Sequence, residues 1–191
     1  MKGLGLDYQR AEASTGTDFV RLPAGGYVCR IISATDYPEA TDKDGNPKPY
    51  LDIVYDIAEG EHAGYYADEW GRTNTWAHSV RWYYTKNALG VFKGNLKAVD
   101  ESNGTSFEVS ALTGIDERKL AGCLVGMIIG EEEYEGNDGS VKTRLRVRFT
   151  RPAAQIREGR FKQPEIKKLA PSEPEYVPPT PTGEDDLPFG W

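Results

Sequence analysis

Alternating apolar and polar residues predict β-strands in the first part of the chain. Residues 26–37 are rich in β-branched and aromatic side chains, and residues 50–58 carry an apolar residue at every second position. Because successive side chains of a strand point to opposite faces, the apolar residues of the second run should share one buried face: Leu51, Ile53, Tyr55 and Ile57. Residues 42–46 read Asp-Lys-Asp-Gly-Asn. This segment predicts the turn between the two strands, since Gly and Asn tolerate positive φ.

Residues 86–100 form the best helix candidate. Apolar residues recur near helical spacing along this stretch, at Ala88, Val91, Phe92, Leu96 and Val99. Further on, Asp116 can cap a short helix over 117–121. A single helical turn is also expected near Ile156, in an otherwise irregular basic segment.

Two more strands are predicted over 124–134 and 141–149, joined by a Gly-Asn-Asp-Gly turn, and at least one strand lies within residues 65–84. The predicted fold is mainly β: its strands form a five-stranded barrel with a helix between the third and fourth strands. This is the plan of the OB fold. We assign the domain to residues 21–169, after a flexible lead-in over 1–20.

Composition is that of a globular protein, with 38% hydrophobic residues and a further 21 glycines among 191 residues. The chain has no apolar run long enough to span a membrane, and residues 1–20 lack the apolar centre of a signal peptide. We therefore expect a cytoplasmic protein. Cys29 and Cys123 lie in apolar, strand-like surroundings, which predicts free thiols rather than a disulfide.

Charge is segregated along the chain, although the net charge of −7 alone argues against a nucleic-acid ligand. Residues 170–191 carry five acids and no Lys or Arg, whereas residues 141–168 carry ten Lys or Arg and two acids. A basic segment beside an acidic one can still attract a polyanion locally.

The predicted fifth strand alternates apolar residues with cations. Val141, Thr143, Leu145, Val147 and Phe149 should face the core, which leaves Lys142, Arg144, Arg146 and Arg148 in a row about 7 Å apart. That spacing approximates the phosphates of an extended single strand, so Arg144, Arg146 and Arg148 are candidate backbone contacts. Two other interpretations stay open: the cations can protect a strand edge, or they can pair with Glu131–Glu133 on the neighbouring strand.

Residues 65–84 contain seven aromatic residues and three of the four tryptophans. Single-stranded nucleic acid is held by stacking bases on aromatic faces while cations follow the backbone. The stacking candidates are Tyr65, Trp70, Trp76, Trp82 and Tyr84, and the accompanying phosphate contacts are Arg72, Arg81 and Lys86. Trp82 and Tyr84 share a strand face, as do Arg81 and Tyr83, so one of these pairs should point inward. The alternative is that the aromatic residues fill the core.

Enzyme motifs are scarce in the chain. It has no Walker A loop, no nucleophile elbow and no His-Glu-x-x-His, and its two histidines lie far in sequence from both cysteines. We expect neither catalysis nor a cofactor or metal. A magnesium-dependent nuclease using Glu131–Glu133 is a minor alternative.

Residues 170–191 read as a disordered tail. The segment 170–183 contains five prolines, and 184–189 reads Glu-Asp-Asp-Leu-Pro-Phe. An apolar tip behind an acidic run predicts a protein-docking element made of Asp185, Asp186, Leu187, Pro188 and Phe189. A tail that only aids solubility would explain the acids but not the tip.

This tip resembles that of bacterial and phage single-stranded DNA-binding proteins (SSBs), in which the chain usually stops at the Phe, whereas here Gly190 and Trp191 follow. Residues 22–169 also resemble phage replication-module proteins with the OB fold, in Leu-Pro-Ala-Gly-Gly-Tyr (22–27), Glu-Gly-Glu-His-Ala-Gly (59–64), Ile-Gly-Glu-Glu-Glu-Tyr (129–134) and Pro-Glu-Ile-Lys-Lys-Leu (164–169). The resemblance implies a non-catalytic phage SSB that coats single strands and recruits replication or recombination proteins. The alternative is an OB-fold adaptor that joins proteins without touching DNA. The oligomeric state stays open.

Overall fold

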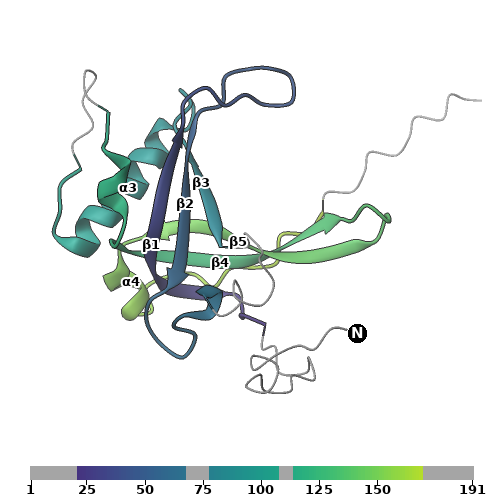
Figure 1. Ribbon diagram of the computed structural model, residues 1–191. Coiled ribbons are helices and arrows are strands. Elements are labelled where there is room, and N and C mark those ends of the chain that lie inside the picture. The colour runs from purple at the N-terminus through teal and green to yellow at the C-terminus, as the bar shows by residue number, and fades with distance from the viewer. Residues whose placement is uncertain (1–20, 68–77, 108–113, 170–191) are drawn as a thin grey trace, which may run out of the picture.

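A computed structural model describes residues 21–67, 78–107 and 114–169 (Figure 1). Its centre is one antiparallel sheet of five strands, β1 (Gly25–Tyr37), β2 (Tyr50–Ile57), β3 (Ser79–Tyr83), β4 (Leu124–Glu135) and β5 (Val141–Arg151). The helical elements around it include α3 (Leu89–Asn103), the 3-10 helix η1 (Glu117–Leu120) and α4 (Ala153–Arg157). The strands are ordered β3-β2-β1-β4-β5, so β3 and β5 are the two edges of the sheet. The mainly β architecture is as predicted, with α3 between β3 and β4.

The core lies on one face of the sheet and follows the predicted alternation of β2. Leu51, Ile53, Tyr55 and Ile57 are all at most 2% exposed. They pack with buried residues of β1 and β4, namely Cys29, Ile31, Val125, Met127 and Ile129. A register shift between Ile31 and Ser33 leaves Ile32 half-exposed on the opposite face of β1. Both cysteines are free thiols, Cys29 buried and Cys123 partly exposed.

Helix α3 begins and ends three residues later than the sequence predicts. Phe92, Leu96 and Val99 are buried as expected, but Val91 is 69% exposed, because one residue corresponds to about 100° around a helix. The helix ends at Gly104, which adopts a φ of 65° and donates its N–H to the carbonyl of Asp100. This left-handed cap is the conformation that glycine adopts at the least cost. Asp116 caps η1 as predicted, since its side chain accepts from the N–H of Arg118.

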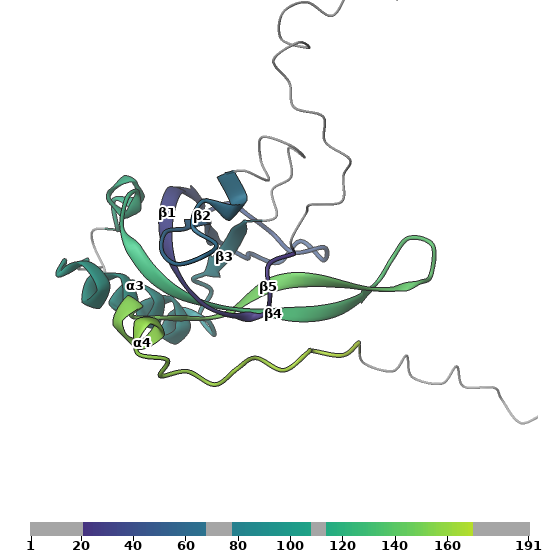
Figure 2. The same cartoon turned by 90° about the horizontal axis from the view of Figure 1, so that it is seen from below.

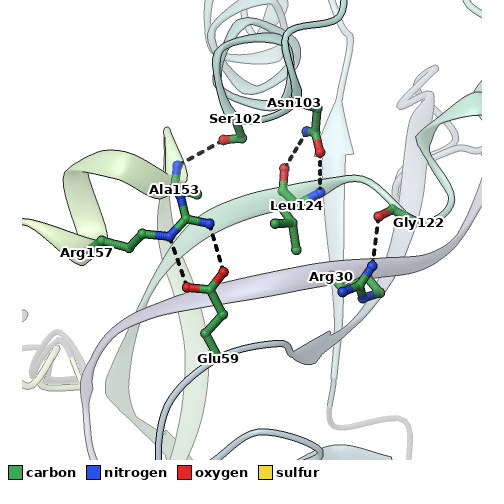
Figure 3. Close-up of polar contacts among 8 residues, drawn as sticks. All are labelled: Arg30, Glu59, Ser102, Asn103, Gly122, Leu124, Ala153 and Arg157. Carbon is green, nitrogen blue, oxygen red and sulfur yellow. Dashed lines mark hydrogen bonds and ion pairs between the residues drawn. The ribbon is translucent and has the colours of Figure 1, made fainter.

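Side chains at the end of α3 hold the following elements in place (Figure 3). The Asn103 amide donates to the carbonyl of Leu124 and accepts from its N–H, both at 2.8 Å, which fixes the start of β4. The Ser102 hydroxyl accepts from the N–H of Ala153 at 2.9 Å, at the start of α4. Helix α4 is also joined to the segment after β2 by two hydrogen bonds from Arg157 to the Glu59 carboxylate, at 2.7 and 3.0 Å.

Helix α4 and the residues after it cover the outer side of β1 and β4. A second apolar cluster forms there from Val28, Ile128, Ala153 and Ile156, with Phe161 packed against it. Glycines permit this close approach: a Cβ on Gly126 would lie 2.5 Å from Ile156, and one on Gly26 would lie 2.6 Å from Phe161. We call residues 158–169 the strap.

The far parts of β4 and β5 form a projecting hairpin, residues 130–146, which we call the arm. It projects from the side of the sheet opposite α3 and α4 (Figures 1 and 2). It is free of β1 because the β1–β4 pairing ends at Gly25 and Ile129. The strap covers part of the exposed β4 edge instead: Lys167 donates its N–H to Glu131 and accepts from the N–H of Glu133, both at 2.9 Å. Among the described residues, no helix is long and apolar enough to cross a bilayer.

Candidate nucleic-acid interface

Three tyrosines line up across β1, β2 and β3. Tyr37 is the register partner of Tyr50, and Tyr50 is the register partner of Tyr83. Tyr50 precedes the buried Leu51, so strand alternation places it on the face opposite the core. We call these three residues the tyrosine row.

The rings of the tyrosine row contact one another and carry two cations. Tyr37 and Tyr50 are stacked, with centroids 5.0 Å apart and planes 21° apart, and Tyr83 lies 5.5 Å from Tyr50. The Arg81 guanidinium lies 4.7 Å from the Tyr50 centroid, and the Lys48 ammonium lies 5.2 Å from that of Tyr83. Such cation–π contacts orient the cations without neutralising their charge.

A hollow of about 360 Å³ adjoins the tyrosine row and the β1–β2 loop. Its lining includes three cations and two acids, Lys43, Lys48, Arg81, Asp42 and Asp44. The Asp42 carboxylate points into its own loop and accepts from the N–H groups of Asn46 and Asp44, at 2.9 and 3.0 Å; these hydrogen bonds, led by that of Asn46, lower its pKa. The carboxylate thus shapes the predicted turn.

Arg81 keeps its full charge in this hollow. A hydrogen bond with the Tyr83 side chain raises the pKa of Arg81, so the guanidinium stays protonated. Asp52 is opposite Arg81 in the register, yet the two are not within ion-pair distance. Arg81 is therefore an exposed cation held against two tyrosines.

Three aromatic residues predicted to stack on bases also contribute to the fold: Trp82 is buried, and Tyr65 and Tyr84 are half-buried. Trp82 is 3% exposed and belongs to the core. The Tyr84 hydroxyl donates to Asp36 at 2.6 Å, and its ring lies 5.5 Å from Phe92. The Tyr65 hydroxyl accepts from the N–H of Leu22 at 3.1 Å. The inward-pointing pair is thus Trp82 and Tyr84, and the outward-pointing pair is Arg81 and Tyr83.

Several other predicted site residues lie outside the described residues. These are Trp70, Arg72 and Trp76, together with the docking tip Asp185, Asp186, Leu187, Pro188 and Phe189. Lys86 is described and exposed, in the connection between β3 and α3.

Two of the predicted β5 cations share one carboxylate on the arm. Arg144 and Arg146 lie 3.6 and 3.7 Å from Glu132 Oε2, and Lys167 of the strap lies 3.0 Å from Oε1. The hydrogen bond from Lys167 is the main cause of the lowered pKa of Glu132. The alternative of pairing with the acids of the neighbouring strand is therefore confirmed for Arg144 and Arg146, although three cations around one carboxylate leave a positive excess.

A bulge breaks the alternation predicted for β5. Ile128 pairs with Phe149 and Ile129 pairs with Val147, so Arg148 is the extra residue. Leu145 and Val147 pack against the core, but beyond the bulge Phe149 is 55% exposed and Thr150 is buried. The expectation that Phe149 faces the core is wrong, because one inserted residue reverses the faces that follow it. Val141 is also exposed, at 62%, since it lies on the arm.

The bulge also gives Arg148 a hydrogen-bond partner that Arg144 and Arg146 do not share, although Arg148 still contributes to the lowered pKa of Glu132. Arg148 donates to the carbonyl oxygen of Glu131 at 2.7 Å and lines a cleft that includes Arg81. The structure thus brings Arg144 and Arg146 together at Glu132 and places Arg148 in the same cleft as Arg81.

The tyrosine row is not among the site residues that the sequence pattern predicts, although the sequence contains an indication of it. Tyr37 ends the first predicted strand and Tyr50 begins the second. Pairing these two ends across the predicted turn would have placed the rings side by side. The sequence pattern groups Tyr83 with Arg81 on one strand face and gives no indication of a role for Lys48.

Comparison of the sequence with models of protein families finds no match, and a search of curated proteins finds no relative. Within the described residues, no group of His, Cys, Asp or Glu side chains is arranged to hold a metal ion.

Proposed function

We propose that this chain is a single-stranded DNA-binding protein. It binds unpaired bases on the face of β1, β2 and β3 that lies opposite the core. The observation that carries the proposal is the tyrosine row, with Arg81 and Lys48 on its rings. Aromatic faces bind bases of any sequence by stacking, at about 1–3 kcal/mol per base, and neighbouring cations hold the phosphates. A protein that coats DNA needs this tolerance of sequence.

The strand order supports an OB-type barrel as the scaffold. In such a barrel the sheet curls until its third and fifth strands approach each other, with a helix inserted between the third and fourth strands. Here β3 and β5 are the edges, α3 connects β3 to β4, and residues of both edges and α3 line one cleft. We propose that this cleft marks the closure of the barrel.

The acidic tip completes the proposed function. Asp185, Asp186, Leu187, Pro188 and Phe189 would dock replication or recombination proteins, in a phage-encoded protein acting in the host cytoplasm. Deleting residues 184–191 should leave DNA affinity unchanged or slightly higher, because the removed acids no longer compete with phosphates. Loss of DNA binding in this variant would contradict a protein-docking role.

The tyrosine row can be tested by fluorescence anisotropy with a labelled dT oligomer at two salt concentrations. The double variant Tyr37→Ala, Tyr83→Ala should bind at least tenfold more weakly, since each lost stacking contact is worth about 1–3 kcal/mol. The matched control Tyr37→Phe, Tyr83→Phe keeps both rings and should bind nearly as well as the wild type. A wild type that does not bind dT at either salt concentration would exclude the proposal and favour the protein adaptor.

A further inference from the structure

A cleft of about 350 Å³ separates the two edges of the sheet. We call it the edge cleft. It is lined by residues of three elements: β3 contributes Val80, Arg81 and Trp82, α3 contributes Val91, Gly94 and Asn95, and β5 contributes Val147, Arg148, Phe149, Thr150 and Arg151. Among the described residues, the lining includes three arginines and no carboxylate.

The two β5 arginines of the edge cleft keep their charge. Arg148 donates to the carbonyl oxygen of Glu131 at 2.7 Å, and Arg151 donates to that of Thr150 at 2.9 Å. Carbonyl oxygens orient a guanidinium without cancelling its charge. Arg151 has no carboxylate neighbour among the ion pairs of the described residues, while Arg148 also lies close enough to Glu132 to help lower the pKa of that carboxylate. The edge cleft is therefore suited to an anionic ligand.

The edge cleft also offers an aromatic face. Phe149 is 55% exposed because of the bulge at Arg148, and the Arg151 guanidinium lies 5.3 Å from its ring centroid. This pairing of ring and cation repeats that of Tyr50 and Arg81. In addition, the indole N–H of the buried Trp82 has no acceptor among the described residues.

The edge cleft is continuous with the proposed DNA-binding face. Arg81 lines both the hollow beside the tyrosine row and the edge cleft. Arg81 is therefore a residue shared by two places where a ring and a cation occur together.

We infer that the edge cleft is a second nucleotide subsite, which binds the same DNA strand as the tyrosine row. The strand would pass from the tyrosine row over Arg81 into the edge cleft, stack a base on Phe149 and place phosphates near Arg148 and Arg151. This inference rests on the proposed function, and it implies that only an oligomer long enough to reach both places uses Phe149.

Phe149→Ala tests the inference with dT oligomers of two lengths, about 4 and about 12 nucleotides. These lengths span the lower part of the range of site sizes of OB folds. The affinity of this variant for the longer oligomer should be at least about fivefold lower than that of the wild type, which corresponds to one lost stacking contact. Its affinity for the shorter oligomer should equal that of the wild type. Val141→Ala is the matched control, since Val141 is a similarly exposed apolar residue of β5 that lies outside the cleft. Tyr37→Ala should weaken the binding of both oligomers.

The outcomes separate this inference from the proposed function. If the wild type binds both oligomers and Phe149→Ala changes neither affinity, or both equally, the edge cleft is not a subsite, and the tyrosine row stands. If the wild type binds neither oligomer, both proposals fail. Thermal unfolding of each variant checks that the fold is retained.

In a folded Arg151→Ala variant, the affinity for the longer oligomer should depend less on salt concentration than it does in the wild type. An unchanged salt dependence of the affinity would remove the phosphate contact from the inference.

Discussion

The tyrosine row and the arm both present cations, but they hold them differently. Arg81 and Lys48 lie on aromatic rings and form no ion pair with a described carboxylate. Arg144 also lies on a ring, that of Tyr134 at 4.8 Å, but it shares the Glu132 carboxylate with Arg146. A ring leaves the charge available to a phosphate, and a carboxylate offsets it. The difference shows that register across strands, rather than the number of cations along one strand, decides which of these cations lie beside a carboxylate.

The difference is one of degree, because the arm is largely exposed. Exposed ion pairs contribute only about 0–1 kcal/mol, so a phosphate could displace Glu132 from Arg144 or Arg146 at small cost. Four predictions measure how far the two regions differ.

The largest effect is expected from Tyr50→Ala. This variant removes the ring between Tyr37 and Arg81, so both neighbours lose their support. Affinity for a dT oligomer should fall at least tenfold, from the loss of one or more stacking contacts of about 1–3 kcal/mol. Anisotropy titration measures the loss, and Tyr50→Phe should restore most of the affinity. Equal losses in both variants would mean that the hydroxyl, and not the ring, is needed.

Arg81→Ala and Arg144→Ala compare the two regions directly. Each removed phosphate contact should lower the slope of log K against log salt by about 0.7 for a single strand. Arg81→Ala should show this full decrease, while Arg144→Ala should show a smaller one, because Glu132 already offsets part of its charge. Titrations at several salt concentrations give both slopes. The reverse order would mean that the arm, and not the tyrosine row, is the main electrostatic contact.

Glu132→Gln should release the arm cations and tighten DNA binding a few-fold, because Arg144, Arg146 and Lys167 would lose their shared carboxylate. Glu135→Gln is the matched control, since it makes the same change of charge on an exposed residue of the arm that forms no ion pair with a described residue. Equal gains in DNA affinity in both variants would mean that the effect comes from the change in net charge alone.

The smallest effect is expected from pH. The pKa of Glu132 in the folded protein is lowered, chiefly by the hydrogen bond from Lys167, so this carboxylate stabilises the strap above its ordinary pKa of about 4.3. That contribution should be lost as the pH falls through the lowered value. The NMR amide resonance of Lys167 should then move toward its unfolded position, and Glu132→Gln should abolish this dependence. A shift that persists in Glu132→Gln would assign the titration to another carboxylate.

Local patterns in the sequence were enough to predict most of the fold. The alternation of apolar and polar residues over Leu51–Ile57 predicted β2 and its buried face, and Asp116 predicted the cap of η1. Both features depend only on neighbours in sequence. The bulge at Arg148 could not be predicted, since it arises from pairing with Ile128 and Ile129 and leaves no mark on the β5 sequence itself. The exposure of Phe149, and with it the edge cleft, follows from that bulge.

The candidate site was harder to predict than the fold. Local clustering of aromatic residues pointed to Tyr65, Trp82 and Tyr84, which stabilise the fold through burial or through hydroxyl hydrogen bonds. The tyrosine row takes one residue from each of three strands, so it becomes visible only when their register is known. The sequence pattern includes Arg81 among the candidate residues as a neighbour of tryptophans, whereas the structure places its guanidinium on the Tyr50 ring.

The attachment of the strap to the arm would set the reach of any protein that binds the proposed docking tip. Lys167 pairs with Glu131 and Glu133, and the Leu169 N–H donates to the Glu133 carboxylate, so the last described residue lies beside the arm and not beside α4. Even a fully extended backbone from Leu169 to Asp185 covers no more than roughly 55 Å. A recruited enzyme would thus be confined to a sphere centred near the projecting hairpin, and lengthening or shortening this connection should change its local concentration at the DNA without altering either binding surface.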